Sequence, residues 1–359
     1  MSEQTELAFL HSKPTATGDL RTEYEDFKVF EMLPFAPTGE GEHLFIHIRK
    51  TGANTLFVAK QLEKYFKVKS MHVGYAGLKD RNAVTEQFFG IHLPGKQEYD
   101  LSDLKIEGVE ILSIQRHNKK LKTGALLGNR FEITLRNVSD VEDVQQRWQK
   151  VVEQGVPNYF GEQRFGRDGH NIDAALAMFA GKKVKDKKKR SFYLSAARSY
   201  LFNKIVEQRI EQGLFAKPLA GDVFMLNGSR SIFSGEEIND EILARLKSNN
   251  ISITAPMWGA GELLTEDDAK QLELDFAKQH QQLCDGLVEF GLKQERRRMQ
   301  LTIDAPKFSH SGNTVTLSFF LPAGCFATTI LREVIDYKDI AAQRVFNAHK
   351  SEAGKQVSK

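Results

Sequence analysis

The sequence predicts an α+β protein with two domains, or with one domain that carries a large insertion. At 359 residues the chain exceeds the usual size of a single core. Its first third holds strand-like runs with few helices between them, and strand texture returns near residue 314 after a helix-rich middle third. We therefore expect an antiparallel or mixed sheet whose chain is interrupted by an inserted domain.

The first third contains the clearest strand and helix signals. Alternating apolar and polar residues in "HLFIHIRK" predict a strand, and "NTLFVAKQLEKYFKV" predicts an amphipathic helix with Asn54 as its N-cap. The apolar face of that helix is expected to hold Leu56, Ala59, Leu62 and Phe66. Four strand-like runs follow, "SMHVGYAGL", "TEQFFGIHL", "VEILSIQRH" and "NRFEITLRNV", before a helix over about 140–153.

Helical periodicity dominates the middle of the chain. The run "SFYLSAARSYLFNKIVEQRI" repeats apolar residues at helical spacing, and a long helical stretch is predicted from about Asp267 to Met299. A strand at "NTVTLSFFLP" and a helix that begins near Phe326 complete the pattern. The tail over 350–359 is polar enough that we expect it to be disordered.

Composition excludes several classes of protein. The net charge is only +3 and the isoelectric point about 8.6, so a polyanion must bind at a local basic patch. Cys284 and Cys325 are too few for a disulfide framework and lack the spacing of a zinc site. Without a leader-like start or an apolar run of membrane length, the sequence predicts a cytoplasmic protein with no membrane and no metal partner.

Asp80 is the first candidate for chemistry. In "GYAGLKDRNAVTEQ" it occupies a Gly-containing turn between Lys79 and Arg81. Neighbouring cations favour the ionised form of a carboxylate, and an ionised carboxylate can act as a nucleophile. A solvated turn aspartate is the commoner explanation of such a triplet, and the local residues leave both interpretations open.

Basic runs are the second candidate feature. "KKVKDKKKR" carries seven cations in nine positions, and "RHNKKLK" and "RRR" at 296–298 add two further groups. Such a run is often a solvated loop, but three of them in a chain of low net charge favour a nucleic-acid partner, and RNA in particular. The cations expected to meet the RNA backbone are Lys182, Lys183, Lys187, Lys188, Lys189 and Arg190.

Several aromatic residues and one amide lie in polar surroundings. Phe27, Phe326 and the pair Tyr159 and Phe160 could each stack on an exposed base, although any single aromatic is more often part of a core. Asn129 could read the edge of a base or simply occupy a turn. No phosphate-binding loop, dinucleotide fingerprint or zinc-deaminase signature is present in the sequence.

Taken together, the motifs "GYAGLKDRNAVTEQ", "VPNYFGEQRFG", "KRSFYLSAARS" and "LPAGCFATTILREV" resemble the TruD family of tRNA pseudouridine synthases. The resemblance runs from about Gly18 to Tyr337 in the order of the family. It implies an isomerase that converts uridine 13 of tRNA, near the D stem, into pseudouridine. It also implies that a target base is flipped out of the RNA, and that no cofactor or metal is needed.

The resemblance assigns roles to individual residues. Asp80 matches the catalytic aspartate of the family, Phe27 the aromatic that stacks on the target base, and Asn129 and Phe326 positions that line the uridine pocket. Arg21 stands where the family commonly has a lysine that faces the catalytic carboxylate. Arginine and lysine differ in geometry, so this role is the least closely matched.

The resemblance also implies an architecture. A pseudouridine synthase catalytic domain with a central, mainly antiparallel sheet is expected over 1–155 and 303–349, interrupted by an inserted α/β TRUD domain over 156–302. The two domains are expected to form a V-shaped cleft that admits tRNA, and the protein is expected to be a monomer. Two alternatives stay open: an RNA-binding or RNA-folding protein of the same fold without catalysis, and a hydrolase that pairs Asp80 with Glu86.

Overall fold

The computed structural model describes residues 6–95, 97–166, 169–234 and 237–344, so the expected disordered tail over 350–359 lies outside the described residues. The chain divides into two compact units. Unit 1 comprises the chain up to Lys13, Glu153–Thr302 and Thr328–Glu333. Unit 2 comprises Pro14–Val152, Ile303–Ala327 and the chain from Val334 onward.

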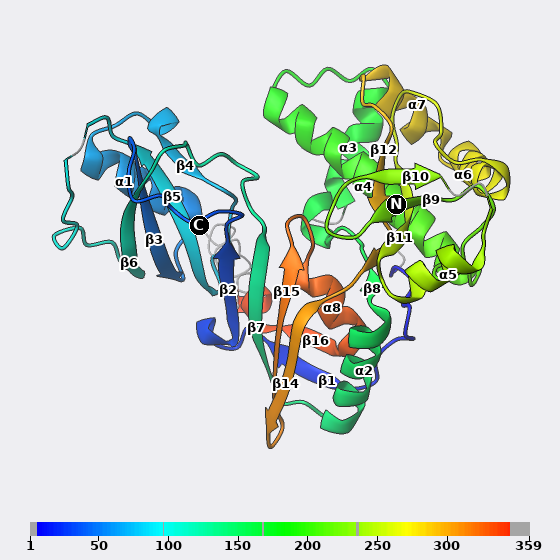
Figure 1. Ribbon diagram of the computed structural model, residues 1–359, viewed down its shortest axis with the longest axis horizontal. Coiled ribbons are helices and arrows are strands. Elements are labelled where there is room, and N and C mark those ends of the chain that lie inside the picture. The colour runs from blue at the N-terminus through cyan, green and yellow to red at the C-terminus, as the bar shows by residue number, and fades with distance from the viewer. Residues whose placement is uncertain (1–5, 96, 167–168, 235–236, 345–359) are drawn as a thin grey trace, which may run out of the picture. The chain divides into compact units, whose positions relative to one another are not determined.

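Unit 2 is built on one large sheet. Its path runs β14-β15-β7-β2-β5-β3-β6, with β1 beside β7, β16 beside β1, and β4 beside β5 (Figure 1). The strands are β1 (Thr17–Leu20), β2 (Phe27–Met32), β3 (His43–Thr51), β4 (Val73–Tyr75), β5 (Val84–His92), β6 (Val109–His117), β7 (Gly128–Arg136), β14 (Asp304–Ser311), β15 (Thr314–Pro322) and β16 (Asp336–Asp339). Two pairs, β2 with β5 and β1 with β16, are parallel, and the other pairs are antiparallel.

Helix α1 (Thr55–Phe66) covers part of one face of this sheet. The side chain of Asn54 accepts a hydrogen bond from the Leu56 amide at 2.8 Å, which confirms the predicted N-cap. The helix packs into the core through Val58, Ala59 and Leu62. Leu56, expected on this apolar face, is 48% exposed. The buried face begins with Thr55 instead and continues through Val58, Ala59 and Leu62.

Unit 1 places helices around a four-stranded sheet of order β10-β9-β11-β12. Its strands are β9 (Val223–Leu226), β10 (Ile232–Ser234), β11 (Ile251–Met257) and β12 (Glu295–Arg298), and β8 (Val156–Pro157) pairs with β13 (Gln300–Leu301). The other α-helices among the described residues are α2 (Val141–Gln154), α3 (His170–Phe179), α4 (Lys187–Glu211), α5 (Asp240–Lys247), α6 (Asp267–Gln279), α7 (Gln281–Glu289) and α8 (Ala327–Val334). Helix α2 ends at the border between the units. None of the described helices has the length and apolarity to cross a membrane.

The long helix predicted over Asp267–Met299 is wrong. Two shorter helices, α6 and α7, occupy its first part, and the chain then leaves α7 through Gly291, whose φ is +76°. The last part is strand β12, which pairs with β11. Glutamate, glutamine and arginine favour helices locally, but pairing with a distant strand decides the structure of this segment.

Candidate active site

Asp80 lies in the loop 76–83 that joins β4 to β5 in unit 2. Its side chain is exposed, as is that of Leu78, whereas the side chain of Lys79 between them is only 6% exposed. Within the described part of the chain, the Asp80 carboxylate forms no hydrogen bond or ion pair. The loop therefore presents one carboxylate to solvent while it buries the adjacent cation.

The sheet below this loop carries an unusual set of polar side chains. Strand pairing aligns Lys50 with Thr85, and Val29 with both Thr85 and Phe131, so these side chains share one face. Two residues further along the strands, the same face presents Gln87, Glu31 and Asn129. Glu31, Lys50, Thr85 and Gln87 are all buried. Buried polar groups need partners, and the loop supplies several of them.

Lys79 ties the loop to this face. Its ammonium lies 3.0 Å from Glu31 Oε2 and donates a hydrogen bond to Asn129 Oδ1 at 2.7 Å. Its backbone amide donates to Thr55 Oγ1 at 3.0 Å. The other oxygen of Glu31 accepts from the Phe88 amide at 2.9 Å. A buried ion pair with several hydrogen bonds is rigid. Lys79 therefore fixes the position of the loop relative to the sheet.

Hydrogen bonds on both sides of Asp80 hold the rest of the loop. Thr55 Oγ1 donates to Gln87 Oε1 at 2.9 Å, and Gln87 Nε2 donates to the Gly77 carbonyl at 3.3 Å. On the other side, Arg81 Nε donates to the Gly52 carbonyl at 3.1 Å. The loop is therefore held by buried side chains before Asp80 and by the exposed side chain of Arg81 after it, which limits the positions that the Asp80 carboxylate can take.

Phe27 begins β2 and lies at the edge of the sheet where the parallel strand β5 also begins. It is 4% exposed, and its ring packs edge-on against Phe131 with centroids 6.2 Å apart. The guanidinium of Arg21 lies 5.6 Å from the Phe27 ring centroid. The Phe27 ring is therefore packed against neighbouring side chains and has little free surface.

Arg21 forms an ion pair with Asp339 of β16, with Nε 3.1 Å from Oδ1. Burial works to lower the pKa of Arg21, but the hydrogen bonds and charge of Asp339, together with the charge of Asp80, raise it above its usual value. Arg21 is thus close enough to Asp80 to interact with its charge, while its hydrogen bonds go to Asp339. Its predicted place facing the catalytic carboxylate stays a prediction.

Phe27 begins β2, whereas Asn129 pairs with Glu31 near the other end of that strand. Phe326 follows the end of β15, which pairs with the start of β7 next to Asn129. Asn129 is the second residue of β7, opposite Glu31 and Leu321, and its side-chain oxygen already accepts the bond from Lys79. Phe326 is half-buried in the turn between β15 and α8. The structure thus links Asn129 directly to the Asp80 loop.

A family model described as "tRNA pseudouridine synthase D (TruD)" matches residues 5–178 and 178–334. The chain belongs to the TruD family. It is 58% identical to tRNA pseudouridine synthase D of Colwellia psychrerythraea over 348 residues, which cover 94% of this chain and 95% of the relative. It is 51% identical to tRNA pseudouridine synthase D of Aeromonas hydrophila over 334 residues, covering 93% and 95%.

A solved structure shares the fold. The crystal structure of a Methanosarcina mazei protein assigned to TruD superposes with a TM-score of 0.70 and 23% sequence identity, covering 91% of this chain and 95% of that one. The match confirms the predicted α+β class. The family match confirms the resemblance stated from the four motifs.

Sequence reasoning missed the buried polar residues that support the TruD loop. Lys50, Glu31 and Gln87 were not expected near the site, yet each contacts the loop or its anchor Lys79. A signal was present: each occupies an inward position in a strand whose other inward residues are mostly apolar, such as Ile46 and Ile48 before Lys50. An ionisable residue in such a register is a candidate for a supporting role.

The basic runs fall into two kinds. Lys182, Lys183 and Lys187–Lys189 are exposed in the turn before α4 and in its first turn. The grouping of 296–298 with the phosphate-binding runs is contradicted for Arg296, which is buried against Glu273 with Nη1 2.8 Å from Oε1. Arg298 donates to Asn227 Oδ1 at 2.9 Å.

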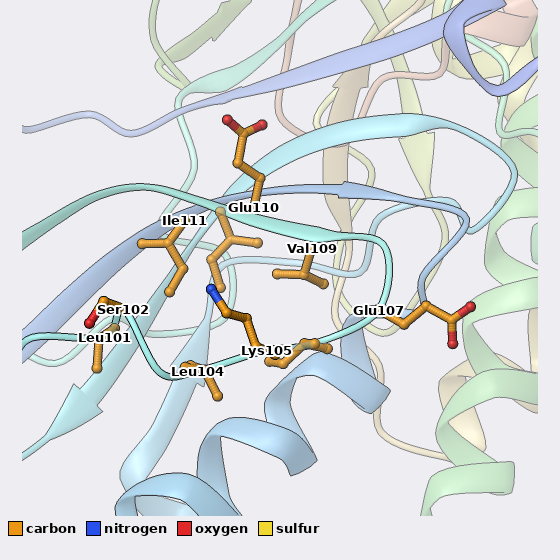
Figure 2. A pocket seen from close by; sticks show the side chains of 10 residues that line it. Leu101, Ser102, Leu104, Lys105, Glu107, Val109, Glu110 and Ile111 are labelled. Carbon is orange, nitrogen blue, oxygen red and sulfur yellow. The ribbon is translucent and has the colours of Figure 1, made fainter.

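A pocket of about 520 Å³ lies in unit 2 and is lined by other residues than these. Figure 2 shows Leu101, Leu104, Val109 and Ile111 around it, with Glu110 pointing away. None of the predicted site residues lines it. Across the described residues, no group of three or more His, Cys, Asp and Glu side chains is arranged to bind a metal ion.

Proposed function

We propose that this protein is a tRNA pseudouridine synthase that isomerises uridine 13 of tRNA to pseudouridine, with Asp80 as its catalytic residue. The observation that carries the proposal is an exposed carboxylate on a loop that buried Thr55 and Gln87 hold before Asp80 and that the exposed side chain of Arg81 holds after it. The names of the relatives, which are tRNA pseudouridine synthases D, support the reaction. Cytoplasmic location, where tRNA is found, and a monomeric state belong to the same proposal.

The reaction breaks the N1–C1′ glycosidic bond, rotates the uracil and forms a C5–C1′ bond. One ionised carboxylate can start it by attack at C1′, by removal of the C2′ proton, or by attack at C6 of the uracil. After the new carbon–carbon bond forms, a proton leaves C5, and Asp80 is the nearest base among the assigned residues. Atoms and charge balance without a redox partner, because the reaction is an isomerisation.

The reacting uridine has to leave the RNA stack before Asp80 can reach it. Flipping a base costs a few kcal/mol, and stacking on an aromatic ring recovers about 1–3 kcal/mol. We assign that stacking to Phe27, and assign the edge of the uracil to Asn129 and Phe326. Because Phe27 is buried and packs near Arg21, binding of the base includes a local rearrangement there.

The run Lys182–Arg190, whose lysines are exposed and whose Arg190 is half-buried, is assigned to the tRNA backbone. Within the described residues, none of these basic side chains forms an ion pair. Lys187–Lys189 also sit in the first turn of α4, where the helix dipole disfavours cations. Their charge does not help the helix, which supports a role toward an external anion such as phosphate.

The test is release of tritium from tRNA transcripts labelled at C5 of uracil. Wild type is compared with Asp80→Asn, with Asp304→Asn as a matched control at an exposed aspartate of unit 2, and with a transcript that lacks uridine 13. We expect release by wild type and by the control variant only, and only from the transcript with uridine 13. Tight tRNA binding without release by wild type would instead establish an RNA-binding protein.

A further inference from the structure

Lys50 is the most deeply buried cation near Asp80. It occupies an inward position near the end of β3 and has 0% of its surface exposed. Its ammonium donates hydrogen bonds to the carbonyl oxygens of Asp80 at 2.8 Å and Ala53 at 2.9 Å, and a longer one to that of Lys79 at 3.5 Å. Within the described part of the chain it forms no ion pair.

Burying the Lys50 ammonium in this way carries a large desolvation penalty. A buried ammonium normally has a carboxylate partner, because desolvation penalises an isolated charge heavily. Here the acceptors are main-chain carbonyls from two segments, the turn after β3 and the loop that carries Asp80. A methionine would fill the same space at a lower desolvation cost. The geometry therefore points to a function for the charge at this place.

The contacts show what the ammonium does to the loop. The bond to the Asp80 carbonyl is the one that restrains the reacting residue itself, whereas Thr55 and Gln87 restrain its neighbours Lys79 and Gly77. With its carbonyl held from inside the sheet, the residue directs its carboxylate outward. Lys50 thus anchors the backbone of Asp80 from inside the sheet with the hydrogen bonds of a charged donor.

We propose that Lys50 is a positioning residue for the isomerisation, which fixes the main chain of Asp80 through the charge-assisted hydrogen bond of its ammonium to the Asp80 carbonyl oxygen. This inference rests on the proposed function. Lys50 touches neither substrate nor reacting atoms in this role, and acts only through Asp80.

The titration of Lys50 gives a way to test whether its charge strengthens the hydrogen bonds that anchor the loop. Burial lowers the pKa of Lys50 to about 8, with the charge of Asp80 opposing and that of Lys79 reinforcing the shift. Asp80 and Lys79 are the charged groups that face it. Above pH 8 a neutral amine keeps two N–H donors but no charge. Hydrogen bonds from a charged donor are about twice as strong as neutral ones, so the anchor weakens and activity should fall as pH rises through about 8.

The experiment measures single-turnover tritium release and tRNA affinity from pH 6.5 to 9. It compares wild type with Lys50→Met, with Thr55→Val, which loosens the loop but keeps the charge, and with Lys105→Met, an exposed lysine of unit 2, as the matched control. For Lys50→Met we expect a rate about 100-fold lower with tRNA affinity within twofold of wild type, and no decline above pH 8. Thr55→Val should be slower than wild type but should retain the decline.

Two results would overturn the proposal. One is a Lys50→Met rate equal to that of wild type, and the other is a wild-type rate that stays constant from pH 7 to 9. The second needs no variant to fold, so the test stands even if Lys50→Met is unstable. Both results require tritium release by wild type, and so they differ from failure of the proposed function, in which wild type releases none.

Discussion

Two arginine- and lysine-rich runs of unit 1 look alike in the sequence and differ completely in the structure. Lys182–Arg190 lies in a turn and the first turn of α4, with its lysines exposed. Arg296–Arg298 lies in β12, paired to β11, and its side chains contact neighbouring segments. The comparison teaches that local charge density says little about whether cations are free to bind an anion, because a strand can pair its arginines with partners that are distant in the sequence.

Arg296 shows how complete this burial is. Its guanidinium contacts both oxygens of Glu273 at 2.8 and 3.0 Å, and it donates to the side chain and carbonyl of Thr254 at 2.9 and 2.7 Å. Both side chains of the ion pair are 2% exposed. Thr265 Oγ1 donates a further bond to Glu273 at 3.0 Å. This arginine joins β12, β11 and α6, and it cannot at the same time neutralise a phosphate.

The largest effect is expected for Arg296→Met. Removal of one partner leaves the Glu273 charge buried without compensation, which costs about 3–5 kcal/mol of stability. Urea unfolding should show a loss of this size. The double variant Arg296→Met/Glu273→Leu should recover most of it, because no charge then stays buried. A single variant as stable as wild type would contradict the structural role of Arg296.

Neutralising the exposed run should change binding and leave folding intact. With Lys187, Lys188 and Lys189 replaced by Gln, we expect the KM for tRNA to rise about tenfold at moderate salt, and the salt dependence of log Kd to become shallower by about one for each phosphate that is no longer neutralised. The rate at saturating tRNA and the melting temperature should stay close to those of wild type. An unchanged salt dependence would remove these lysines from the RNA interface.

A structural feature can be predicted from the sequence when contacts between neighbouring residues determine it, and is missed when contacts between distant segments do. The cap at Asn54 and the strand β3 follow from neighbouring residues and were predicted. Strand β12 was predicted as helix, because only pairing with β11 makes it a strand. The fold class needed only the overall order of elements.

The site divides in the same way. Asp80 and Asn129 could be named from motifs, but the bond from Lys79 that connects Asn129 to the Asp80 loop could not, because it depends on the register of β2, β5 and β7. Lys50 could not be identified from the sequence for a similar reason. Its importance comes from a carbonyl thirty positions away in the chain, which no local pattern specifies.

A smaller effect is expected from the cap of α4. Asp186 accepts hydrogen bonds from the Lys188 and Lys189 amides at 2.8 and 3.2 Å, and these bonds from Lys189 and Lys188 lower the pKa of Asp186. The stability that Asp186 contributes is fully present above the pKa of its carboxyl group in the unfolded chain. It is lost as pH falls through the lower pKa that this group has in the folded protein. Asp186→Ala should therefore lower the melting temperature by a few degrees at pH 7, and the difference from wild type should vanish in strong acid. A difference that persists there would mean that the cap acts by other means.

The smallest effect is expected for Arg298→Ala, although it removes a cation from the same run as Arg296. Arg298 donates to Asn227 Oδ1 at 2.9 Å and to the Ser229 carbonyl at 3.4 Å, and both contacts are exposed. Water can replace them, so the free energy of unfolding should change by no more than about 0.5 kcal/mol. Because the side chain is already bonded within unit 1, the salt dependence of tRNA binding should also stay unchanged. A shallower salt dependence in this variant would show that Arg298 contacts RNA. Only Arg296 and Arg297 of the β12 run would then differ from Lys182–Arg190 in being held within unit 1.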